Sequence, residues 1–239
     1  MVDFLKKIAE SFLNALYPVK TNCTFCGKKI ENGMPVCGEC LSGLEMISPP
    51  FCEKCGKPLY KDLSTYCYDC RRKKHYFEKA RAYGVYEGVL KGLIHEFKYN
   101  GERRLSTFFG EKLFEAYERY GFEDIEVIVP VPLHKKREEK RGFNQSLLLA
   151  KELGERTKKE VRDALIRTRN TEHQTALPRE KRDENVKDAF KIKIGSPVGG
   201  KNVLLVDDVY TTGNTADECA KALLSGGAKK VYVITLARG

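Results

Sequence analysis

The segment VLLVDDVYTTGNT, residues 203–215, places two adjacent carboxylates directly after a short apolar run. Asp207 and Asp208 repel each other, and burial beside an apolar strand disfavours the ionised form of both. We therefore expect a cation or hydrogen-bond donors next to the pair. Carboxylates accept strong hydrogen bonds from vicinal hydroxyl groups, so the pair is suited to hold the diol of a sugar.

A short polar loop follows the acidic pair: Thr211, Thr212, Gly213, Asn214 and Thr215. It falls between a predicted strand and a predicted helix, where free backbone N–H groups and the helix dipole favour a phosphate. The threonine hydroxyls add donors, and Gly213 lets the backbone close on the anion. A phosphate-binding loop beside a diol-binding pair predicts a ribose 5-phosphate site. The chain contains neither G-x-x-x-x-G-K-[ST] nor G-x-G-x-x-G, so it is not a Walker loop or a dinucleotide fold.

A second polar segment follows the run VIVPVP, whose prolines end a predicted strand. Its basic residues are Lys135, Lys136, Arg137, Lys140 and Arg141. We interpret this segment as an anion-binding loop that precedes a helix. A solvated charged turn is the alternative.

Eight of the nine cysteines form four C-x-x-C pairs: Cys23 and Cys26, Cys37 and Cys40, Cys52 and Cys55, Cys67 and Cys70. The two-residue spacer lets both thiolates of a pair face one tetrahedral zinc ion, and two pairs complete a site without an open position. We predict two structural zinc ions in a small double zinc ribbon over residues 20–72. Pairing in sequence order and an interleaved pairing use the same eight ligands. The ninth, Cys219, lies in a predicted helix and is expected to be a buried apolar residue.

The chain has 43 basic and 33 acidic residues among 239, a net charge of +10. This balance fits a polyanionic partner, and it also fits a solvated charged surface. The cluster RRKK at 71–74, with His75, Tyr76 and Phe77, is of the kind that can hold single-stranded nucleic acid, unless it is a solvated linker. No apolar run approaches a membrane span, and residues 1–19 predict an amphipathic helix rather than a signal peptide. We therefore expect a cytoplasmic protein.

The elements that must position these residues alternate between strand and helix over residues 78–239. Strands are expected over 80–86, 125–132, 203–208 and 229–237, and helices over 89–99, 105–120, 144–157 and 215–228. This alternation predicts an α/β domain with a parallel sheet flanked by helices. In such sheets ligands bind outside the carboxyl ends of the strands, where the acidic pair and the basic segment both fall.

The acidic pair and its loop together, D-D-x-x-T-T-G-x-T, resemble the PRPP-binding motif of type I phosphoribosyltransferases. Other motifs sharpen the resemblance: V-P-V-P-L at 129–133, R-G-F-N-Q at 141–145, and then Thr171, Gln174, Leu177, Arg182 and Asn185 at matching spacings. With the cysteine pairs ahead of them, these motifs are similar to those of the ComF/GntX family over nearly the whole chain.

This resemblance implies roles for individual residues. Asp207 and Asp208 would be the catalytic pair that holds the ribose hydroxyls, and residues 211–215 would bind the 5-phosphate of PRPP. Arg137 and Arg141 would bind the pyrophosphate, with magnesium bridging pyrophosphate and ribose. The polar stretch 167–188, with Gln174 and Arg182, would be a mobile flap. Any chemistry would be displacement at the anomeric carbon of PRPP.

The resemblance also implies a biological role in natural transformation. The protein would handle incoming single-stranded DNA on the cytoplasmic side, with a DNA-translocating ATPase as a partner. The alternative is an active phosphoribosyltransferase of nucleotide or cofactor metabolism without a DNA role. No glutaminase domain precedes the motif, so a glutamine-dependent purine-pathway activity is not expected.

Overall fold

The computed structural model describes residues 21–30, 33–59, 64–122, 124–169, 187–195 and 197–239. Its residues form two compact units, Met1–Gly43 and Leu44–Gly239. The boundaries expected from the motifs, 20–72 and 78–239, divide the chain differently. The second half of the double ribbon belongs to the same unit as the sheet. The helix expected over residues 1–19 lies outside the described residues.

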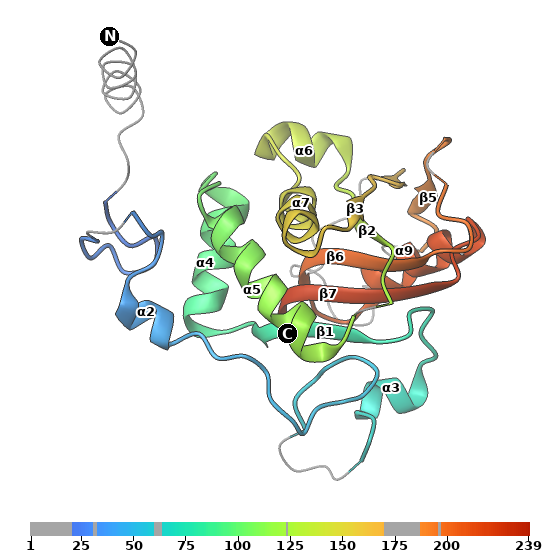
Figure 1. Ribbon diagram of the computed structural model, residues 1–239, viewed down its shortest axis with the longest axis horizontal. Coiled ribbons are helices and arrows are strands. Elements are labelled where there is room, and N and C mark those ends of the chain that lie inside the picture. Colours follow the sequence, from blue (N-terminus) through green and yellow to red (C-terminus); the bar gives the residue numbers. More distant parts are fainter. Residues whose placement is uncertain (1–20, 31–32, 60–63, 123, 170–186, 196) are drawn as a thin grey trace. The chain divides into compact units, whose positions relative to one another are not determined.

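A parallel five-stranded sheet forms the centre of the larger unit, in the order β1-β7-β6-β2-β3 (Figure 1). The strands are β1 (Ala80–Val85), β2 (Val127–Pro130), β3 (Glu160–Val161), β6 (Asn202–Tyr210) and β7 (Lys230–Arg238). Val203 of β6 pairs with Val231 of β7 on one side and with Val127 of β2 on the other. The strands read as nearly continuous apolar runs because both faces of the sheet are covered. The predicted α/β parallel sheet is confirmed.

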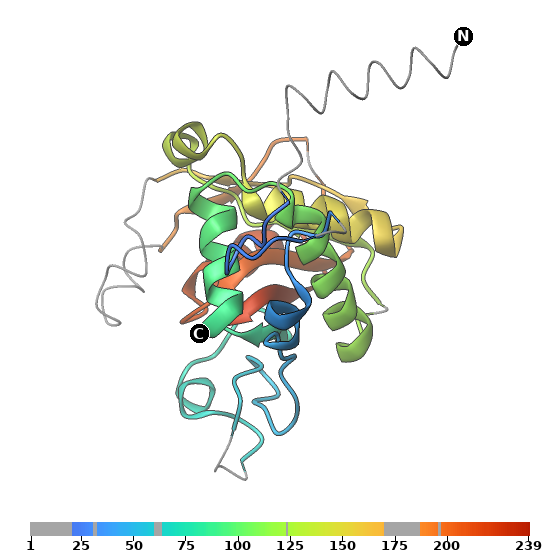
Figure 2. The same cartoon turned by 90° about the vertical axis from the view of Figure 1, so that its left-hand side faces the viewer.

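Helices cover both faces of this sheet. They are α4 (Gly88–Tyr99), α5 (Leu105–Tyr120), α7 (Gln145–Thr157) and α9 (Asn214–Ser225). Helices α5 and α7 pack on each other and on one face of the sheet, and Figures 1 and 2 show α9 on the opposite face. Leu105, Phe109 and Leu113 lie one helical turn apart on α5 and are all fully buried, as expected for an amphipathic helix on a sheet.

Several short elements were not predicted. They are helices α2 (Gly38–Ser42), α3 (Tyr68–Arg72) and α6 (Lys135–Arg141), the edge strand β3, and the antiparallel pair β4 (Leu165–Arg167) and β5 (Phe190–Ile192). The expectation of a loop over the basic segment is wrong, because this segment is helical. The ring of His134 accepts a hydrogen bond from the backbone N–H of Lys136 at its start, and Gly142, with φ of 80°, ends it.

The second half of the ribbon is part of the core under α9. Cys52 and Cys55 share one apolar cluster with Phe77, with Tyr210 of β6 and with Cys219 of α9. The expectation that Cys219 is buried is confirmed. Figure 2 shows this segment (cyan) beside the edge strand β1. Backbone hydrogen bonds fix this placement, for example from the N–H of Ala80 to the carbonyl of Lys54, at 2.8 Å.

Within the described part of the chain, no helix combines the length and the apolar character needed to cross a membrane.

Candidate functional site

The acidic pair lies within β6, which continues past it to Tyr210. The side chain of Asp208 is almost fully buried. The Nζ atom of Lys98, on α4, lies 2.8 Å from its Oδ1. Ser146, at the start of α7, donates a hydrogen bond of 2.8 Å to Oδ1 of Asp207, and the backbone N–H of Asp208 donates to the same atom at 2.9 Å. The expected cation and donors are therefore both present.

The electrostatics of the pair follow from these contacts. Burial and the neighbouring Asp208 carboxylate raise the pKa of Asp207 to about 7, although Lys98 and Ser146 act in the opposite direction. Burial disfavours the charged form of Lys98, but the Asp208 carboxylate outweighs it and raises the pKa of Lys98. Without a ligand, Asp207 therefore holds a proton up to about neutral pH. A cation or a diol that prefers the carboxylate would release that proton.

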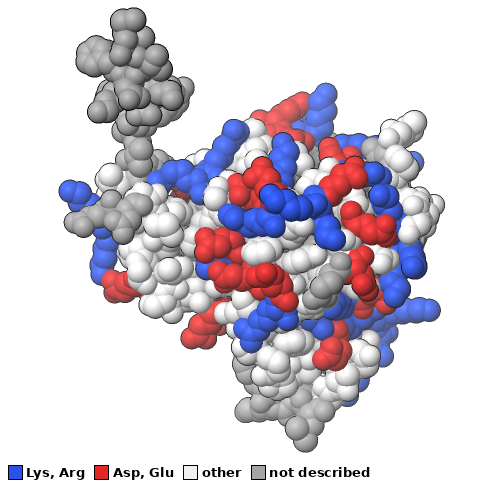
Figure 3. Space-filling view, viewed as in Figure 1, with Lys and Arg blue, Asp and Glu red and all other residues white. Residues whose placement is uncertain are grey.

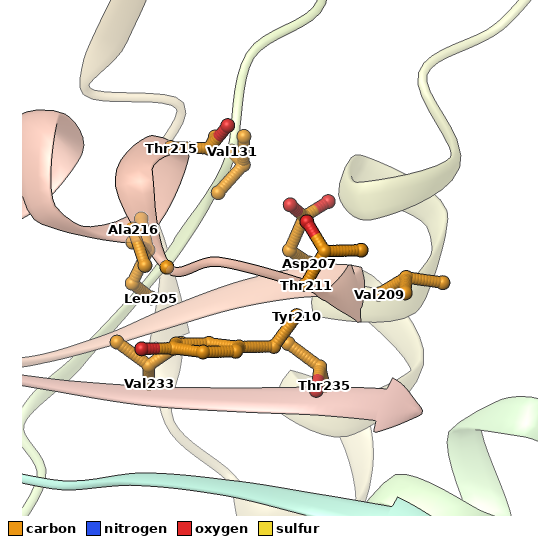
Figure 4. A pocket seen from close by; sticks show the side chains of 11 residues that line it. Val131, Leu205, Asp207, Val209, Tyr210, Thr211, Thr215, Ala216, Val233 and Thr235 are labelled. Carbon is orange, nitrogen blue, oxygen red and sulfur yellow. The ribbon is translucent and has the colours of Figure 1, made fainter. Parts of the chain in front are cut away.

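The loop after the acidic pair turns tightly into α9. Gly213 has φ of 84°, and a Cβ atom there would lie 2.1 Å from the hydroxyl oxygen of Tyr210. Thr212 Oγ1 and Asn214 Nδ2 are buried and have no hydrogen-bond partner among the described residues. Partnerless buried donors are rare in folded proteins, and a bound phosphate would supply acceptors for them. Figure 4 shows Thr215 on one side of the pocket above β6, with Thr211 and Asp207 on the other.

One open cleft of about 790 Å³ joins the acidic pair to the basic segment. Its polar lining residues are Tyr86, Lys98, Tyr99, Arg137, Arg141, Gln145, Ser146, Arg167, Asp207, Asp208, Thr211 and Thr215. The structure thus brings together both aspartates, both predicted arginines and two threonines of the loop. Gln174 and Arg182, expected in a flap, lie outside the described residues.

Sequence reasoning missed four cationic or aromatic residues of the cleft, Tyr86, Lys98, Tyr99 and Arg167. Arg167 ends β4, and its guanidinium lies 5.4 Å from the ring centre of Phe190. Burial, followed by the charge of Arg137, lowers the pKa of Arg167 to about 10. The only signal for Lys98 was the unanswered charge of the acidic pair, because a lysine on an amphipathic helix is usually on the solvated face.

The eight paired cysteines form two groups in sequence order, and within each group the four sulfur atoms lie within 4.8 Å of one another. The sulfur atoms of Cys55 and Cys67 are 3.7 Å apart, as are those of Cys26 and Cys37. A tetrahedral zinc with Zn–S bonds of about 2.3 Å places its sulfur ligands about 3.8 Å apart. Both groups therefore fit a zinc ion. The first lies in the smaller unit, and the second, formed by Cys52, Cys55, Cys67 and Cys70, lies in the larger one.

The basic and aromatic cluster at 71–77 is arranged differently from the prediction. The side chains of His75 and Phe77 are only 3% and 1% exposed, so the expectation that they are available to stack on bases is wrong. The exposed rings of this region are Tyr66, Tyr68 and Tyr76. Arg72 lies over the ring of Tyr68 at 5.2 Å. On the face drawn in Figure 3, basic and acidic side chains are interspersed and form no continuous basic area.

Comparisons with known proteins identify two domain families in this chain. Residues 12–71 match the double zinc ribbon domain, and residues 139–239 match the phosphoribosyl transferase domain. The chain is 32% identical to the DNA utilization protein YhgH of Escherichia coli, over 90% of this chain and 96% of that protein. It is 31% identical to the competence protein ComFC of Bacillus subtilis, over 85% and 84% of the two chains. Among solved structures, the glutamine PRPP amidotransferase of B. subtilis aligns with 59% of this chain and 30% of that one, at 22% identity and a TM-score of 0.40.

Proposed function

Because this chain belongs to the ComF family, we propose that it binds PRPP together with magnesium, and that it acts in the use of incoming single-stranded DNA. The observation that carries the first part is the shared cleft. The acidic pair of β6, the loop before α9 and the arginines of α6 all line one cavity, although the arginines come from a separate part of the sequence. Each group matches one part of PRPP: the diol, the 5-phosphate and the pyrophosphate.

In this proposal the chain's own residues hold the ligand across the cleft. The carboxylates of Asp207 and Asp208 accept hydrogen bonds from the ribose hydroxyls, and the loop at 211–215 donates to the 5-phosphate. Arg137 and Arg141 hold the pyrophosphate. The metal ion would neutralise charge on the pyrophosphate.

If transfer occurs, an acceptor nucleophile forms a bond to the anomeric carbon as the bond to pyrophosphate breaks. The arginines stabilise the charge that develops on the leaving group, and the held ribose supplies orientation. An enzyme of nucleotide or cofactor metabolism without a DNA role would use the same cleft, so the cleft supports either. The names of the relatives favour the DNA role.

The DNA part of the proposal is supported by exposed tyrosine rings in the second half of the ribbon and just after it. Tyr66, Tyr68 and Tyr76 are exposed, and the guanidinium of Arg72 lies 5.2 Å from the ring centre of Tyr68, on a chain with a net charge of +10. Aromatic rings among cations are the usual platform for single-stranded nucleic acid, because bases stack on the rings and phosphates pair with the cations. A cytoplasmic location and a DNA-translocating ATPase as partner are part of this proposal.

Titration of PRPP into the full-length protein by calorimetry, with and without magnesium, tests the PRPP site. We expect saturable binding that requires magnesium and that is lost in Asp207→Ala/Asp208→Ala. Asp163→Ala, which removes an exposed acid outside the cleft, is the matched control and should bind as the unmodified protein does. Equal binding by the double variant would refute the assignment of the acidic pair.

A further inference from the structure

We propose that the second zinc site positions the phosphate loop, so that zinc in this site and a phosphorylated ligand in the loop stabilise each other. Arg238 and His75 are the positioning residues. Each of them joins a cysteine of this site to one end of the loop that runs from Tyr210 to α9.

The first connection runs through Arg238, the last residue of β7. Its guanidinium is almost fully buried. Nη2 donates to Sγ of Cys55 at 3.7 Å, and Nη1 donates to the backbone carbonyl of Thr211 at 2.7 Å and of Tyr210 at 3.4 Å. One side chain thus holds a zinc-ligating sulfur and the first residue of the loop. Its planar guanidinium fixes their spacing, which a flexible amine cannot do.

The second connection reaches the other end of the loop through His75. Nε2 lies 3.4 Å from Sγ of Cys70, and Nδ1 donates to Oδ2 of Asp217 at 2.6 Å. Asp217 stands in the first turn of α9, and its other carboxylate oxygen accepts a hydrogen bond from the backbone N–H of Tyr76 at 3.1 Å. Its own backbone N–H donates to the carbonyl of Gly213 at 2.8 Å.

Two further contacts tighten the same junction. Lys73 donates from Nζ to Oδ1 of Asn214, the first residue of α9, at 2.7 Å. The ring of Tyr210 packs edge-on against Phe77, and the guanidinium of Arg238 lies 4.6 Å from its centre. Gly213 in turn fits against the hydroxyl of Tyr210. The floor of the loop is therefore made by residues that also touch the ribbon.

The consequence is a thermodynamic coupling. Zinc fixes the sulfur atoms of Cys55 and Cys70, and through them the two ends of the loop, so the amides that face the phosphate are already in place before it binds. If zinc in this site raises the affinity of the loop for its ligand by some factor, the bound ligand must raise the affinity of the site for zinc by the same factor.

Hydrogen exchange of the backbone amides of residues 210–217, in the zinc-loaded full-length protein without ligand, is the first test. We expect Arg238→Met to raise exchange in this segment about tenfold, the effect of removing a buried hydrogen-bonding group. Arg81→Met is the matched control. Arg81 is about equally buried and also joins the ribbon to the sheet, through the carbonyl of Glu53, but its side-chain hydrogen bonds in the described structure go to Glu53 and Ala80 and not to a cysteine or the loop. Equal exchange in the two variants would refute the proposal.

The second test measures zinc release to a chromogenic chelator, with and without PRPP and magnesium, and it rests on the proposed function. A Cys23→Ser/Cys26→Ser background leaves zinc in the second site alone. We expect saturating PRPP to slow release about tenfold, a typical allosteric coupling, and Arg238→Met or His75→Ala to abolish this effect. Arg238→Lys, which keeps the charge without the fork, should restore it only in part.

The two tests separate the possible failures. If calorimetry finds no PRPP binding but exchange of the loop responds to Arg238→Met and not to Arg81→Met, the proposed function fails and the positioning role stands. If PRPP binds while zinc release is unchanged and the two variants exchange alike, the PRPP site stands and the positioning role is refuted.

Discussion

The ammonium group of Lys98 lies 2.8 Å from Oδ1 of Asp208, whose side chain is buried, and the Lys98 side chain is only 16% exposed. This ion pair joins α4 to the carboxyl end of β6 and answers the charge repulsion within the acidic pair. The cleft thus contains its own counter-cation before any metal or ligand binds.

Replacing this lysine should be costly for stability. Lys98→Met leaves a buried carboxylate without its partner, so we expect the free energy of unfolding in urea to fall by about 3 kcal/mol. Lys98→Met/Asp208→Asn should recover most of that loss, because no uncompensated charge remains. A double variant as unstable as the single one would mean that the lysine stabilises the fold by packing alone.

The acidic pair should also make stability depend on pH. The pKa of Asp207 is raised in the folded protein to about 7, from about 3.9 in an unfolded chain. Its contribution to stability is therefore present below pH 4 and is lost as pH rises through 7. We expect Asp207→Asn to match the unliganded protein in stability near pH 4 and to exceed it increasingly toward pH 8, by urea unfolding. Parallel curves for the two proteins would contradict the raised pKa.

The turn at Gly213 should not tolerate a side chain. Gly213→Ala requires a left-handed backbone conformation and places Cβ against the hydroxyl of Tyr210. We expect the free energy of unfolding to fall by about 2 kcal/mol. We also expect PRPP binding to fall below the measurable range. Gly199→Ala is the control, since its Cβ would meet open space. Thermal unfolding with calorimetric titration checks both, and equal behaviour of the two variants would argue against a fixed loop.

The arginines of the cleft should distinguish ligands with and without a pyrophosphate group. Arg141→Met should weaken PRPP binding about tenfold and leave ribose 5-phosphate binding unchanged, because a charge-assisted contact to the pyrophosphate is lost. Lys135→Met removes the same charge from an exposed position on α6, and it should change neither affinity more than about twofold. A parallel loss for both ligands would place Arg141 at the 5-phosphate instead.

The exposed tyrosines Tyr68, in the second half of the ribbon, and Tyr76, just after it, should contribute to DNA binding by stacking. Tyr68→Ala/Tyr76→Ala should weaken binding of a labelled oligothymidine about tenfold in fluorescence anisotropy, since each stacked base contributes about 1–3 kcal/mol. Tyr68→Phe/Tyr76→Phe keeps both rings and should bind normally. Binding should also fall steeply with added salt, because the release of counterions from the DNA phosphates drives it. A flat salt response would exclude the nucleic-acid role.

The sequence predicted the sheet, its main helices and the two ends of the cleft because these depend on local patterns. The apolar run before Asp207 marks a buried strand, and the loop chemistry at Thr211 to Thr215 is contiguous. Lys98, Ser146 and Arg167 could not be found in this way. They reach the cleft from α4, α7 and β4, and only the tertiary fold brings them to the acidic pair.

The orientation of the residues after the fourth cysteine pair also escaped prediction. Composition alone could not tell that His75 and Phe77 turn toward the core, while Tyr76 between them stays exposed. The direction is fixed by Asp217, which lies far along the chain and holds both the ring of His75 and the backbone of Tyr76.

The boundary between the two compact units, at Gly43, does not coincide with the end of the double zinc ribbon, at residue 71. The double zinc ribbon matches residues 12–71, but its second half is built into the larger compact unit. A chimera between two relatives that is joined near residue 72 would exchange all eight paired cysteines, and with the last four of them part of the core beneath α9. A chimera joined at Gly43 would leave that core intact, so we expect it to be the more stable of the two.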